Sequence, residues 1–285
     1  MNSVIEIKDL KKSYSGFDLS IDELVIPAGE IIGLIGENGA GKTTFIKLLL
    51  NAINRDSGSI KIFNKDLSSY ELNIKGDIGV VLDNSFFPET LNSSNINFIM
   101  KDIYKNFDSE LFYKYLSDFN IKDSQILKTM SKGMRKKVEI ACALSHHPKL
   151  LILDEATSGL DPIVRNEVLD LFMDFISDSE HTVILSTHIT SDLESIADHI
   201  IFINKGRIIL DSPRDDIFDN YGILKCDISD FSKIDKDDIV SFKKNKYNYD
   251  ILISDRVGCS KKYKDFVIDK ITLMDLMLLI IKGGK

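Results

Sequence analysis

Cysteine is scarce in this chain, and its placement limits what it can do. The 285-residue sequence holds three cysteines, Cys142, Cys226 and Cys259. Because their number is odd and they lie far apart, they fit neither a disulfide framework nor the close ligand spacing of a zinc site. We expect each of them to be a small, buried hydrophobic residue.

Long apolar runs are also missing. No stretch approaches the roughly 18 residues that cross a bilayer, and the most apolar segment, residues 273–281, is interrupted by Asp275. Residues 1–12 alternate apolar and charged side chains and lack the apolar block of a secretory signal. We therefore expect a cytosolic chain that does not span a membrane.

An excess of positive charge is absent as well. The sequence has 36 basic and 44 acidic residues, a net charge of −8, which argues against nucleic-acid binding driven by phosphate neutralisation. No nucleic-acid partner is expected. Hydrophobic residues make up 44% and charged residues 28%, which is typical of a folded globular protein, and the length suggests about two domains.

Apolar and β-branched runs predict the strands of the first part of the chain. They cover residues 4–7, 21–26, 31–35, 59–63 and 77–82. A glycine-rich stretch follows the third run, and from Lys42 onward the apolar spacing is helical, so the local order is strand, glycine loop, helix. The composition is helical from Asn95 to about His147, which indicates a helical insert at about residues 84–147.

A second α/β segment begins at Leu150. An apolar run at residues 150–153, an amphipathic pattern at 162–177 and a strand pattern at 182–186 imply parallel strands joined by helical crossovers. Residues 200–210 predict a closing hairpin. After about residue 221 the charge balance changes from negative to slightly positive, which suggests a separate C-terminal module whose last helix is capped by Thr272.

Residues 36–43, Gly-Glu-Asn-Gly-Ala-Gly-Lys-Thr, match the phosphate-loop pattern. Glycines let backbone N–H groups converge on phosphate oxygens, and the helix that follows directs its N-terminal dipole at the same anion. Lys42 would reach the β- and γ-phosphates, and the hydroxyl of Thr43 would ligate Mg²⁺. The alternative is a plain strand-to-helix turn with a solvated lysine, but the flanking strand and helix favour the phosphate loop.

Two adjacent acids, Asp154 and Glu155, end the apolar run at residues 150–153. Ligands of open α/β sheets bind at the carboxyl ends of the strands, so these acids are predicted to lie beside the phosphate loop. Asp154 would orient hydrated Mg²⁺, and Glu155 would polarise the attacking water as a general base. Taken alone, the run is equally compatible with a strand that ends in solvated acids.

Together these residues resemble the ATP-binding subunit of ATP-binding cassette (ABC) transporters, and further motifs extend the resemblance over about residues 3–222. Residues 131–134, Ser-Lys-Gly-Met, stand at the place of the family signature Leu-Ser-Gly-Gly-Gln, ahead of an amphipathic helix. In the family this segment contacts the γ-phosphate held by the opposite subunit, which implies that role for Ser131 and Gly133. An isolated Ser-x-Gly would be mostly a helix N-cap.

Three more positions match the family in order along the chain. Residues 158–161, Ser-Gly-Leu-Asp, follow the acids like the family's D-loop, which joins the two active sites of a dimer. His188 matches the switch histidine that contacts the γ-phosphate, although a lone histidine at a strand end is usually structural. Tyr14 falls where an aromatic residue stacks on adenine in the family, and Phe17 is its rival for that place.

Two positions depart from the family's pattern. Asp83 stands where the family has glutamine after a strand; it can bind Mg²⁺ or water but cannot donate an amide hydrogen bond. The signature has Lys132 in place of glycine and Met134 in place of glutamine. Ser-Lys-Gly-Met is similar to the variant of bacterial ABC ATPases that serve exporters of drugs or antimicrobial peptides, which points to that subset.

The resemblance implies an α/β fold: a P-loop NTPase core of the ABC-ATPase type with an antiparallel β subdomain and a helical insert, plus a small α+β C-terminal module. The ATP-binding domain would cover residues 1–222 and the accessory module residues 223–285. The implied nucleotide-binding residues are Tyr14, Gly36, Asn38, Gly39, Ala40, Gly41, Lys42, Thr43, Thr44, Ser131 and Gly133. The implied Mg²⁺ ligands are Thr43, Asp83 and Asp154, and the implied catalytic residues are Lys42, Glu155 and His188.

The activity implied by the resemblance is Mg²⁺-dependent hydrolysis of ATP to ADP and phosphate. Two sites would be completed when two ATP-binding subunits, identical or different, meet head to tail. A separate transmembrane permease would bind near Asp83, Phe86 and Phe87. The chain would then lie in the cytoplasm, peripheral on the inner face of the cell membrane.

Two alternatives stay open. A soluble ABC-type ATPase that works on DNA or ribosomes would carry a long coiled coil or a second cassette, and the sequence contains neither. A nucleotide-dependent regulatory subunit with little hydrolysis is compatible with Asp83 and with the altered signature.

Overall fold

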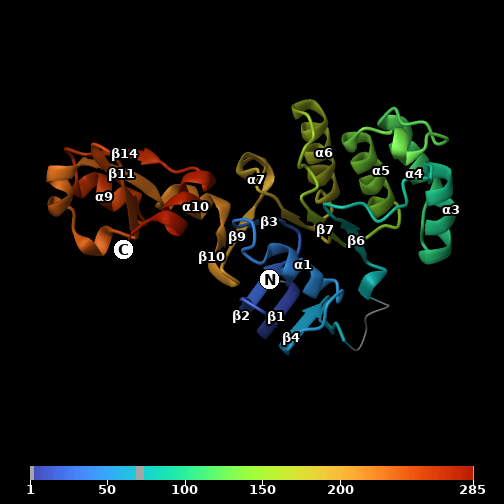
Figure 1. The fold of residues 1–285 in the computed structure, drawn as a ribbon, viewed down its shortest axis with the longest axis horizontal. Helices are drawn as coiled ribbons and strands as arrows, with labels where there is room; N and C mark the ends of the chain where they lie inside the picture. The colour runs from blue at the N-terminus through green and yellow to red at the C-terminus, as the bar shows by residue number, and fades with distance from the viewer. Residues whose placement is uncertain (1–2, 69–73, 285) are drawn as a thin grey trace. The chain divides into compact units, whose positions relative to one another are not determined.

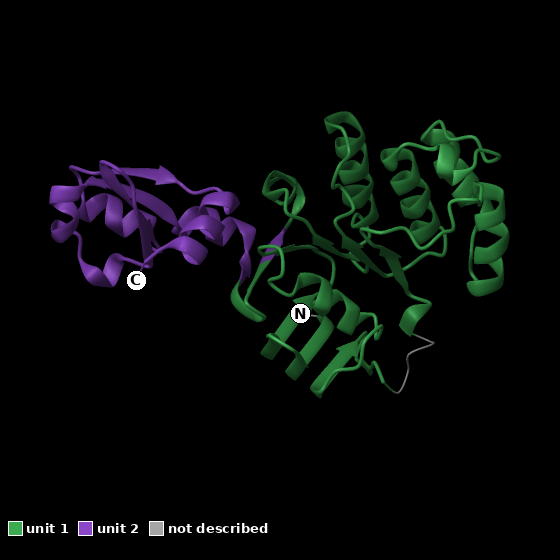
Figure 2. Ribbon diagram, viewed as in Figure 1, with its two compact units in different colours: residues 1–197, 201–210 green, residues 198–200, 211–285 purple. Residues whose placement is uncertain are grey.

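The computed structural model describes residues 3–68 and 74–284, and the chain divides into two compact units (Figures 1 and 2). The first unit consists of Met1–Ala197 and Ile201–Leu210, and the second of Asp198–Ile200 and Asp211–Lys285. The first unit holds an antiparallel sheet and most of a second, largely parallel one, and the second unit holds a further antiparallel sheet. Each unit has its own buried cluster of hydrophobic side chains.

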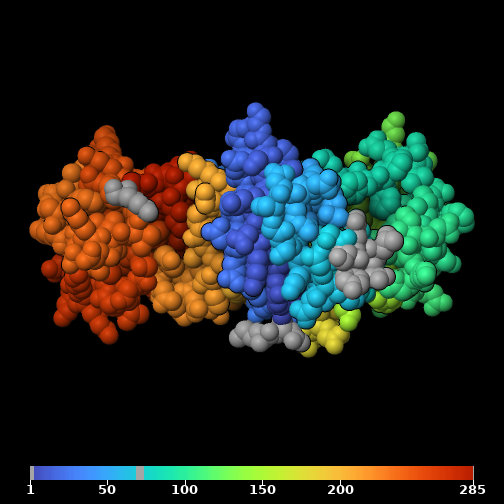
Figure 3. Space-filling view, turned by 90° about the horizontal axis from the view of Figure 1, so that it is seen from below, coloured from blue at the N-terminus to red at the C-terminus, as the bar shows by residue number. Residues whose placement is uncertain are grey.

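An antiparallel sheet begins the first unit. It has the strand order β2-β1-β4-β5 and consists of β1 (Ser3–Tyr14), β2 (Phe17–Pro27), β4 (Ser57–Ile62) and β5 (Lys65–Asp66). The hairpin of β1 and β2 pairs Tyr14 with Phe17. The face seen in Figure 3 shows residues of β1, β2 and β4 side by side in two shades of blue.

The second sheet has the order β10-β9-β3-β8-β7-β6. Its strands are β3 (Ile31–Ile35), β6 (Ile78–Val81), β7 (Leu150–Asp154), β8 (Thr182–Ser186), β9 (His199–Asn204) and β10 (Arg207–Pro213). The pairs β3–β8, β8–β7 and β7–β6 are parallel. Every residue of β3, β7 and β8 is buried, as expected for parallel strands with both faces covered.

Helix α1 (Lys42–Leu49) lies between the two sheets (Figure 1). Its side chains Phe45, Ile46 and Leu49 are fully buried in a cluster that also contains residues of β1, β2, β3, β4 and β7. Because α1 follows directly on the glycine-rich turn after β3, this packing fixes the position of the turn at the edge of the parallel sheet.

The helical insert consists of α3 (Ser93–Ile103), α4 (Ser109–Asp118) and α5 (Lys132–Leu144), with a short 3₁₀ turn at Leu127–Thr129. Each helix begins at a polar cap whose side chain accepts a backbone N–H: Asn92, Asp108 and Ser131 respectively. A separate hydrophobic cluster holds the insert together. Helices α6 (Pro162–Phe175) and α7 (Thr190–Ile196) follow β7 and β8.

The second unit carries an antiparallel sheet of order β12-β13-β11-β14. Its elements are α8 (Arg214–Asn220), β11 (Gly222–Asp227), β12 (Ser241–Lys244), β13 (Asn248–Ile253), α9 (Arg256–Lys262), β14 (Val267–Lys270) and α10 (Leu273–Lys282), with 3₁₀ turns at Ile228–Lys233 and Lys236–Asp238. Thr272 caps α10 by accepting the N–H of Asp275, as predicted. The three cysteines are buried and free, also as predicted.

The predicted fold class is confirmed: an α/β core with an antiparallel β subdomain, a helical insert and a small α+β C-terminal module. The strand pattern at residues 4–7 is only part of the longer β1, and the predicted helix at 162–177 ends at Phe175. The sequence pattern did not predict the short elements β5, α7, α8, β12, α9 and β14. No helix of the described residues is long and apolar enough to cross a membrane.

Candidate functional site

The glycine loop after β3 adopts a backbone that side chains would prevent. Gly36, Gly39 and Gly41 have φ values of 157°, 82° and 117°. A Cβ on Gly36 would lie 2.3 Å from the carbonyl oxygen of Ile203, and one on Gly41 would lie 2.9 Å from the ring of Phe17. Glycine at these two positions is therefore required both by φ and by the close approach of neighbouring atoms.

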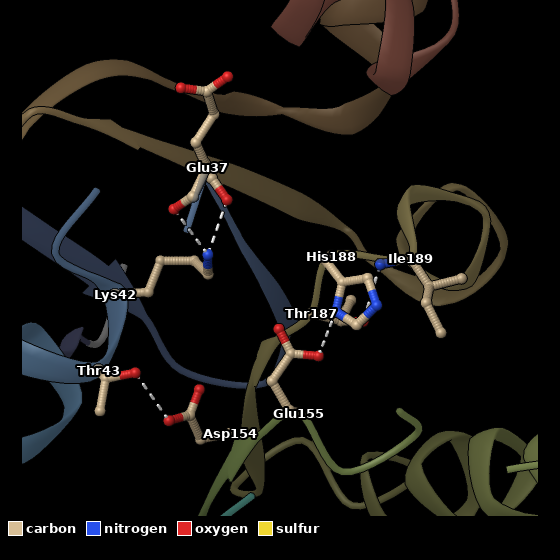
Figure 4. A network of polar contacts seen from close by, with 9 residues as sticks. Glu37, Lys42, Thr43, Asp154, Glu155, Thr187, His188 and Ile189 are labelled. Atoms are coloured by element: carbon tan, nitrogen blue, oxygen red, sulfur yellow. Dashed lines mark hydrogen bonds and ion pairs between the residues drawn. The ribbon is translucent and has the colours of Figure 1, made fainter. Parts of the chain in front are cut away.

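Lys42 is held inside this loop. Its Nζ donates hydrogen bonds to the carbonyl oxygens of Gly36, at 2.7 Å, and Glu37, at 3.2 Å (Figure 4). Burial lowers the pKa of Lys42 below its ordinary value of 10.5, while the charges of Glu155 and Asp154 act in the opposite direction. An anion bound in the loop would supply a further counter-charge for this ammonium group.

Thr43 connects the loop to the carboxylates on β7. Its Oγ1 donates a hydrogen bond of 3.2 Å to Oδ2 of Asp154, the last residue of that strand (Figure 4). Asp154 is buried, and in the register of β7 and β8 it lies opposite Ser186. The glycine loop and the strand of the two acids, more than a hundred residues apart in sequence, thus meet at one point.

Glu155 points toward the start of α7. Its backbone has a φ of 53°, and its N–H donates to the carbonyl oxygen of Ser186 at 2.8 Å. Oε2 of Glu155 lies 2.6 Å from Nδ1 of His188, whose ring is largely exposed (Figure 4). When the carboxylate is ionised, Nδ1 carries the proton of this hydrogen bond and Nε2 is left free to face a ligand or water.

These groups surround a single cavity of about 620 Å³. It is lined by residues from the β1–β2 turn, the glycine loop, the end of β6 and the end of β7: Gly16, Phe17, Glu37, Asn38, Gly39, Gly41, Lys42, Thr43, Thr44, Asp83, Asp154 and Glu155. The sequence analysis did not single out Gly16 or Glu37. The position of Gly16 beside Phe17 and of Glu37 inside the phosphate-loop motif could have indicated them.

Six of the residues that the resemblance implied lie outside the lining of this cavity: Tyr14, Gly36, Ala40, Ser131, Gly133 and His188. Gly36 and Ala40 still belong to the loop, and His188 contacts Glu155. Of the two aromatic candidates for adenine, Phe17 lines the cavity, whereas Tyr14 is half exposed with Nζ of Lys12 5.4 Å from its ring centroid.

The signature segment forms the start of α5. Oγ of Ser131 accepts the N–H of Met134 at 3.2 Å and so caps the helix. A Cβ on Gly133 would come within 3.6 Å of Leu160 and Val164, and one on Gly159 would come within 3.1 Å of Nζ of Lys132. The signature and the segment at residues 158–161 are thus direct neighbours.

The donor set of the cavity fits a magnesium ion that also binds phosphate. Among the residues that the structure describes, no three His, Cys, Asp or Glu side chains are arranged to hold a metal by themselves. The Thr43 hydroxyl, Asp154 and Asp83 offer hard oxygen ligands at one cavity. Mg²⁺ commonly takes one or two carboxylates and completes its shell with phosphate oxygens and water, so these residues fit it.

Comparison with known proteins agrees with this site. A sequence model of the family described as ABC transporter matches residues 19–158. The bacitracin transport ATP-binding protein BcrA of Bacillus licheniformis is 33% identical over 238 residues, which cover 82% of this chain and 78% of that protein. The chain belongs to the ABC transporter family, as an ATP-binding subunit.

Two further similar ATP-binding proteins are named for daunorubicin/doxorubicin resistance and for lantibiotic transport. The daunorubicin/doxorubicin resistance ATP-binding protein DrrA of Streptomyces peucetius is 32% identical, covering 76% of this chain and 68% of that protein. The lantibiotic transport ATP-binding protein SrtF of Streptococcus pyogenes is 34% identical, covering 74% of this chain and 92% of that protein.

Solved structures of the family share the fold. The structure of an ATP-binding subunit of an ABC transporter matches with a TM-score of 0.68 and 26% identity, covering 75% of this chain and 92% of that one. The structure of cbiO1 from Clostridium perfringens, part of the ABC transporter complex cbiONQ, matches with a TM-score of 0.65 and 26% identity, covering 76% and 91%.

Proposed function

We propose that this ABC ATP-binding subunit hydrolyses ATP to ADP and phosphate with Mg²⁺ as cofactor. The observation that carries the proposal is the cavity that Lys42 and Thr43 line together with Asp154, the last residue of β7, and Glu155, which follows it. Lys42 and the loop amides would bind the phosphates. Bound Mg²⁺ would neutralise charge on the phosphate oxygens, held by Thr43 and Asp154 and reached by Asp83.

Glu155 is the proposed general base, and His188 its positioning partner. The 2.6 Å contact between the two side chains fixes the rotamer of Glu155 and leaves its second carboxylate oxygen available for a water molecule. His188 would contact the γ-phosphate through its free ring nitrogen. For the adenine ring we propose an aromatic contact from Phe17 or Tyr14, and the lining of the cavity favours Phe17.

The proposed functional form is a head-to-tail pair of ATP-binding subunits. Ser131 and Gly133 lie outside the cavity that contains Lys42 and Glu155. A signature segment outside its own nucleotide cavity is suited to close the site of a second subunit, because the first N–H groups of a helix such as α5 have no partner within the helix and its dipole favours an anion. ATP would then favour the closed pair and hydrolysis would favour opening.

A groove beside Asp83 is the proposed docking site of a separate transmembrane permease. It has a volume of about 240 Å³ and is lined mainly by apolar and aromatic side chains of the loop after β6, α3 and α5, among them Phe86, Phe87, Met100 and Ile103. Phe86 is 74% exposed. An exposed apolar groove of this kind suits an inserted segment of a partner protein.

We propose that the transporter is an exporter and that the subunit works in the cytoplasm, peripheral on the inner face of the membrane. The Ser-Lys-Gly-Met signature supports this, as do the relatives named for bacitracin transport, daunorubicin resistance and lantibiotic transport. We further propose that the ATP-binding domain covers residues 1–222 and that residues 223–285 form an accessory module with its own α+β core.

Substitution of Glu155 by glutamine tests the enzymatic proposal. Loss of a general base slows a reaction by typically 10²–10⁴-fold, so steady-state phosphate release should fall by about that factor while ATP affinity stays unchanged. Both quantities are measured on purified protein, with Glu30→Gln as an acid-to-amide control away from the cavity lining. Equally slow phosphate release from wild type and Glu155→Gln, with tight ATP binding in both, would instead indicate a regulatory subunit.

A further inference from the structure

A buried ion pair lies within α5, one turn beyond the signature. Nζ of Lys136 lies 3.0 Å from Oε2 of Glu139, and the two side chains are 3% and 10% exposed. Removing both charges from water costs free energy that the pair itself often does not recover, so a buried pair is weak evidence for stability. Its place in the fold suggests a different role.

Lys136 also holds the loop that carries Asp83. The same Nζ donates a hydrogen bond of 2.7 Å to the carbonyl oxygen of Leu82, the residue between β6 and Asp83. Residues 83–86 are exposed. Across the described part of the chain, this is the one hydrogen bond that joins residues 82–87 to another element; the other, from Phe87 N–H to Ser85, stays within the loop.

Glu139 lines two hollows beside this tether. One, of about 320 Å³, is lined by Asp83, Lys132 and Lys136. The other is the groove proposed above for the permease, and Glu139 lines it together with Phe86 and Phe87. A change on the groove side that moves Glu139 would therefore move Lys136, and with it the carbonyl group that precedes Asp83.

We propose that Lys136 and Glu139 are a positioning pair that holds Asp83 at the nucleotide cavity and connects it to the permease groove. Glu139 orients the ammonium group of Lys136, and Lys136 fixes the carbonyl of Leu82. Neither side chain lines the nucleotide cavity, so the pair acts through Asp83. The effect of the pair on catalysis rests on the proposed role of Asp83. The hydrogen bond from Lys136 to Leu82 does not depend on that role and can be tested by itself.

The test is the double substitution Lys136→Met with Glu139→Leu, since a single substitution would leave one buried charge without a partner. Hydrogen exchange followed by mass spectrometry should show faster exchange at Val80 and Val81, the end of β6 that pairs with β7, because the next residue has lost its tether. The protection of α5 and the Tm should stay unchanged. The kcat for ATP hydrolysis should fall by about 10- to 100-fold at unchanged ATP affinity, because a misplaced group costs rate rather than binding. Lys136→Arg, which keeps charge and donor, should restore both readouts.

The matched control is the ion pair between the next residue of α5, Lys137, and Glu167 of α6; neither side chain lines the two hollows described above. Lys137→Met with Glu167→Leu should leave both the exchange of Val80 and Val81 and kcat unchanged. Unaltered exchange and kcat in the Lys136/Glu139 variant would overturn the inference. If wild type hydrolyses no ATP, the proposed function fails, and the exchange measurement still decides whether Lys136 holds the loop.

Discussion

At the residue scale, the environment of Lys42 suits the proposed binding of phosphate rather than the stability of the folded chain. Its ammonium group is buried and satisfied by two backbone carbonyl groups, and this burial lowers its pKa. The unfolded chain therefore binds more protons than the folded chain between the lowered folded value and 10.5. The free energy of unfolding should rise with pH across that interval, and phosphate in the loop should raise the pKa again.

Substitution of Lys42 by methionine should separate folding from binding. Without nucleotide the variant should be at least as stable as wild type, because methionine keeps the length of the side chain and removes a partly desolvated charge. At an ATP concentration about 100 times Kd, wild type should gain about 2.7 kcal/mol of stability, and the variant should gain none. Thermal unfolding with and without Mg-ATP measures both effects.

The control for this prediction is Lys47→Met, on the same helix but away from the cavity lining, which should respond to ATP like wild type. An equal ATP-induced rise of Tm in Lys42→Met and wild type would contradict the placement of the phosphates. The rise in stability with pH below 10.5 should be lost in Lys42→Met, because the group whose pKa is lowered is gone.

Which individual residues meet at the site was only partly predictable. The chemistry of Lys42, Thr43, Asp154 and Glu155 follows from their types and spacing, since the motif specifies its own backbone geometry. The choice between Tyr14 and Phe17 does not follow in this way, because the two aromatic residues pair with each other at the end of one hairpin and only the folded chain shows that Phe17 lines the cavity. Lys136 was missed because an i, i+3 charge pair usually lies on a solvated helix face.

At the scale of elements, α5 combines two tasks. Its N-cap residue, Ser131, caps the helix. Lys136, in the second turn, binds the carbonyl group of Leu82 in the loop after β6. The proposed contact with the nucleotide of a second subunit uses the same hydroxyl that accepts the N–H of Met134. In the proposed pair, the stability of the helix and catalysis would thereby depend on the same side chain.

Substitutions at Ser131 can distinguish these two tasks. Ser131→Ala removes the cap and should lower the free energy of unfolding by about 1 kcal/mol. Ser131→Asp keeps a cap of similar strength but places a carboxylate where a γ-phosphate is expected, so it should retain the stability of wild type and lose at least about a hundredfold in ATPase activity. Chemical unfolding and phosphate release are measured on the same preparations.

Asp108, the cap of α4, supplies the matched control. Asp108→Ala should lower stability through the same loss of a cap while the ATPase activity per folded molecule stays unchanged. Full ATPase activity in Ser131→Asp would show that the start of α5 does not approach a nucleotide, and the hydroxyl would then be a helix cap alone.

The elements themselves were predictable where their pattern is long. Parallel strands such as β7 and β8 are buried on both faces, so they appear as unbroken apolar runs with recognisable ends. The short elements β5, β12 and β14 have two to four residues, too few for a period to show. Helix α7 follows a histidine at a strand end and has no side-chain cap, so its start gives no signal in the sequence.

At the scale of the whole molecule, the residues of the proposed reaction lie at two separate places on the first unit, which favours a pair of subunits. The cavity holds the residues that would bind and hydrolyse ATP, while the signature residues stand outside it. In a two-fold symmetric pair, a residue i of one subunit meets residue j of the other, and the reverse contact occurs at the second site. One such pair would complete both cavities at once.

Mixing two inactive variants tests this arrangement directly. In a pair made of one Lys42→Ala chain and one Ser131→Asp chain, one site combines Lys42 of one subunit with Ser131 of the other and is intact, whereas the second site carries both substitutions. Equal mixing with free exchange makes half of the pairs mixed, so the activity should recover to about a quarter of wild type when each site works independently. Each variant alone should stay near zero, and phosphate release measured against mixing ratio should peak at equal amounts.

The control is a mixture of Lys42→Ala with Glu155→Gln, which should not recover activity. Both residues line the same cavity of one chain, so every site in every pair lacks either Lys42 or Glu155. A mixture of Lys42→Ala and Ser131→Asp that remains as inactive as its components would mean that Ser131 serves the nucleotide of its own chain or none.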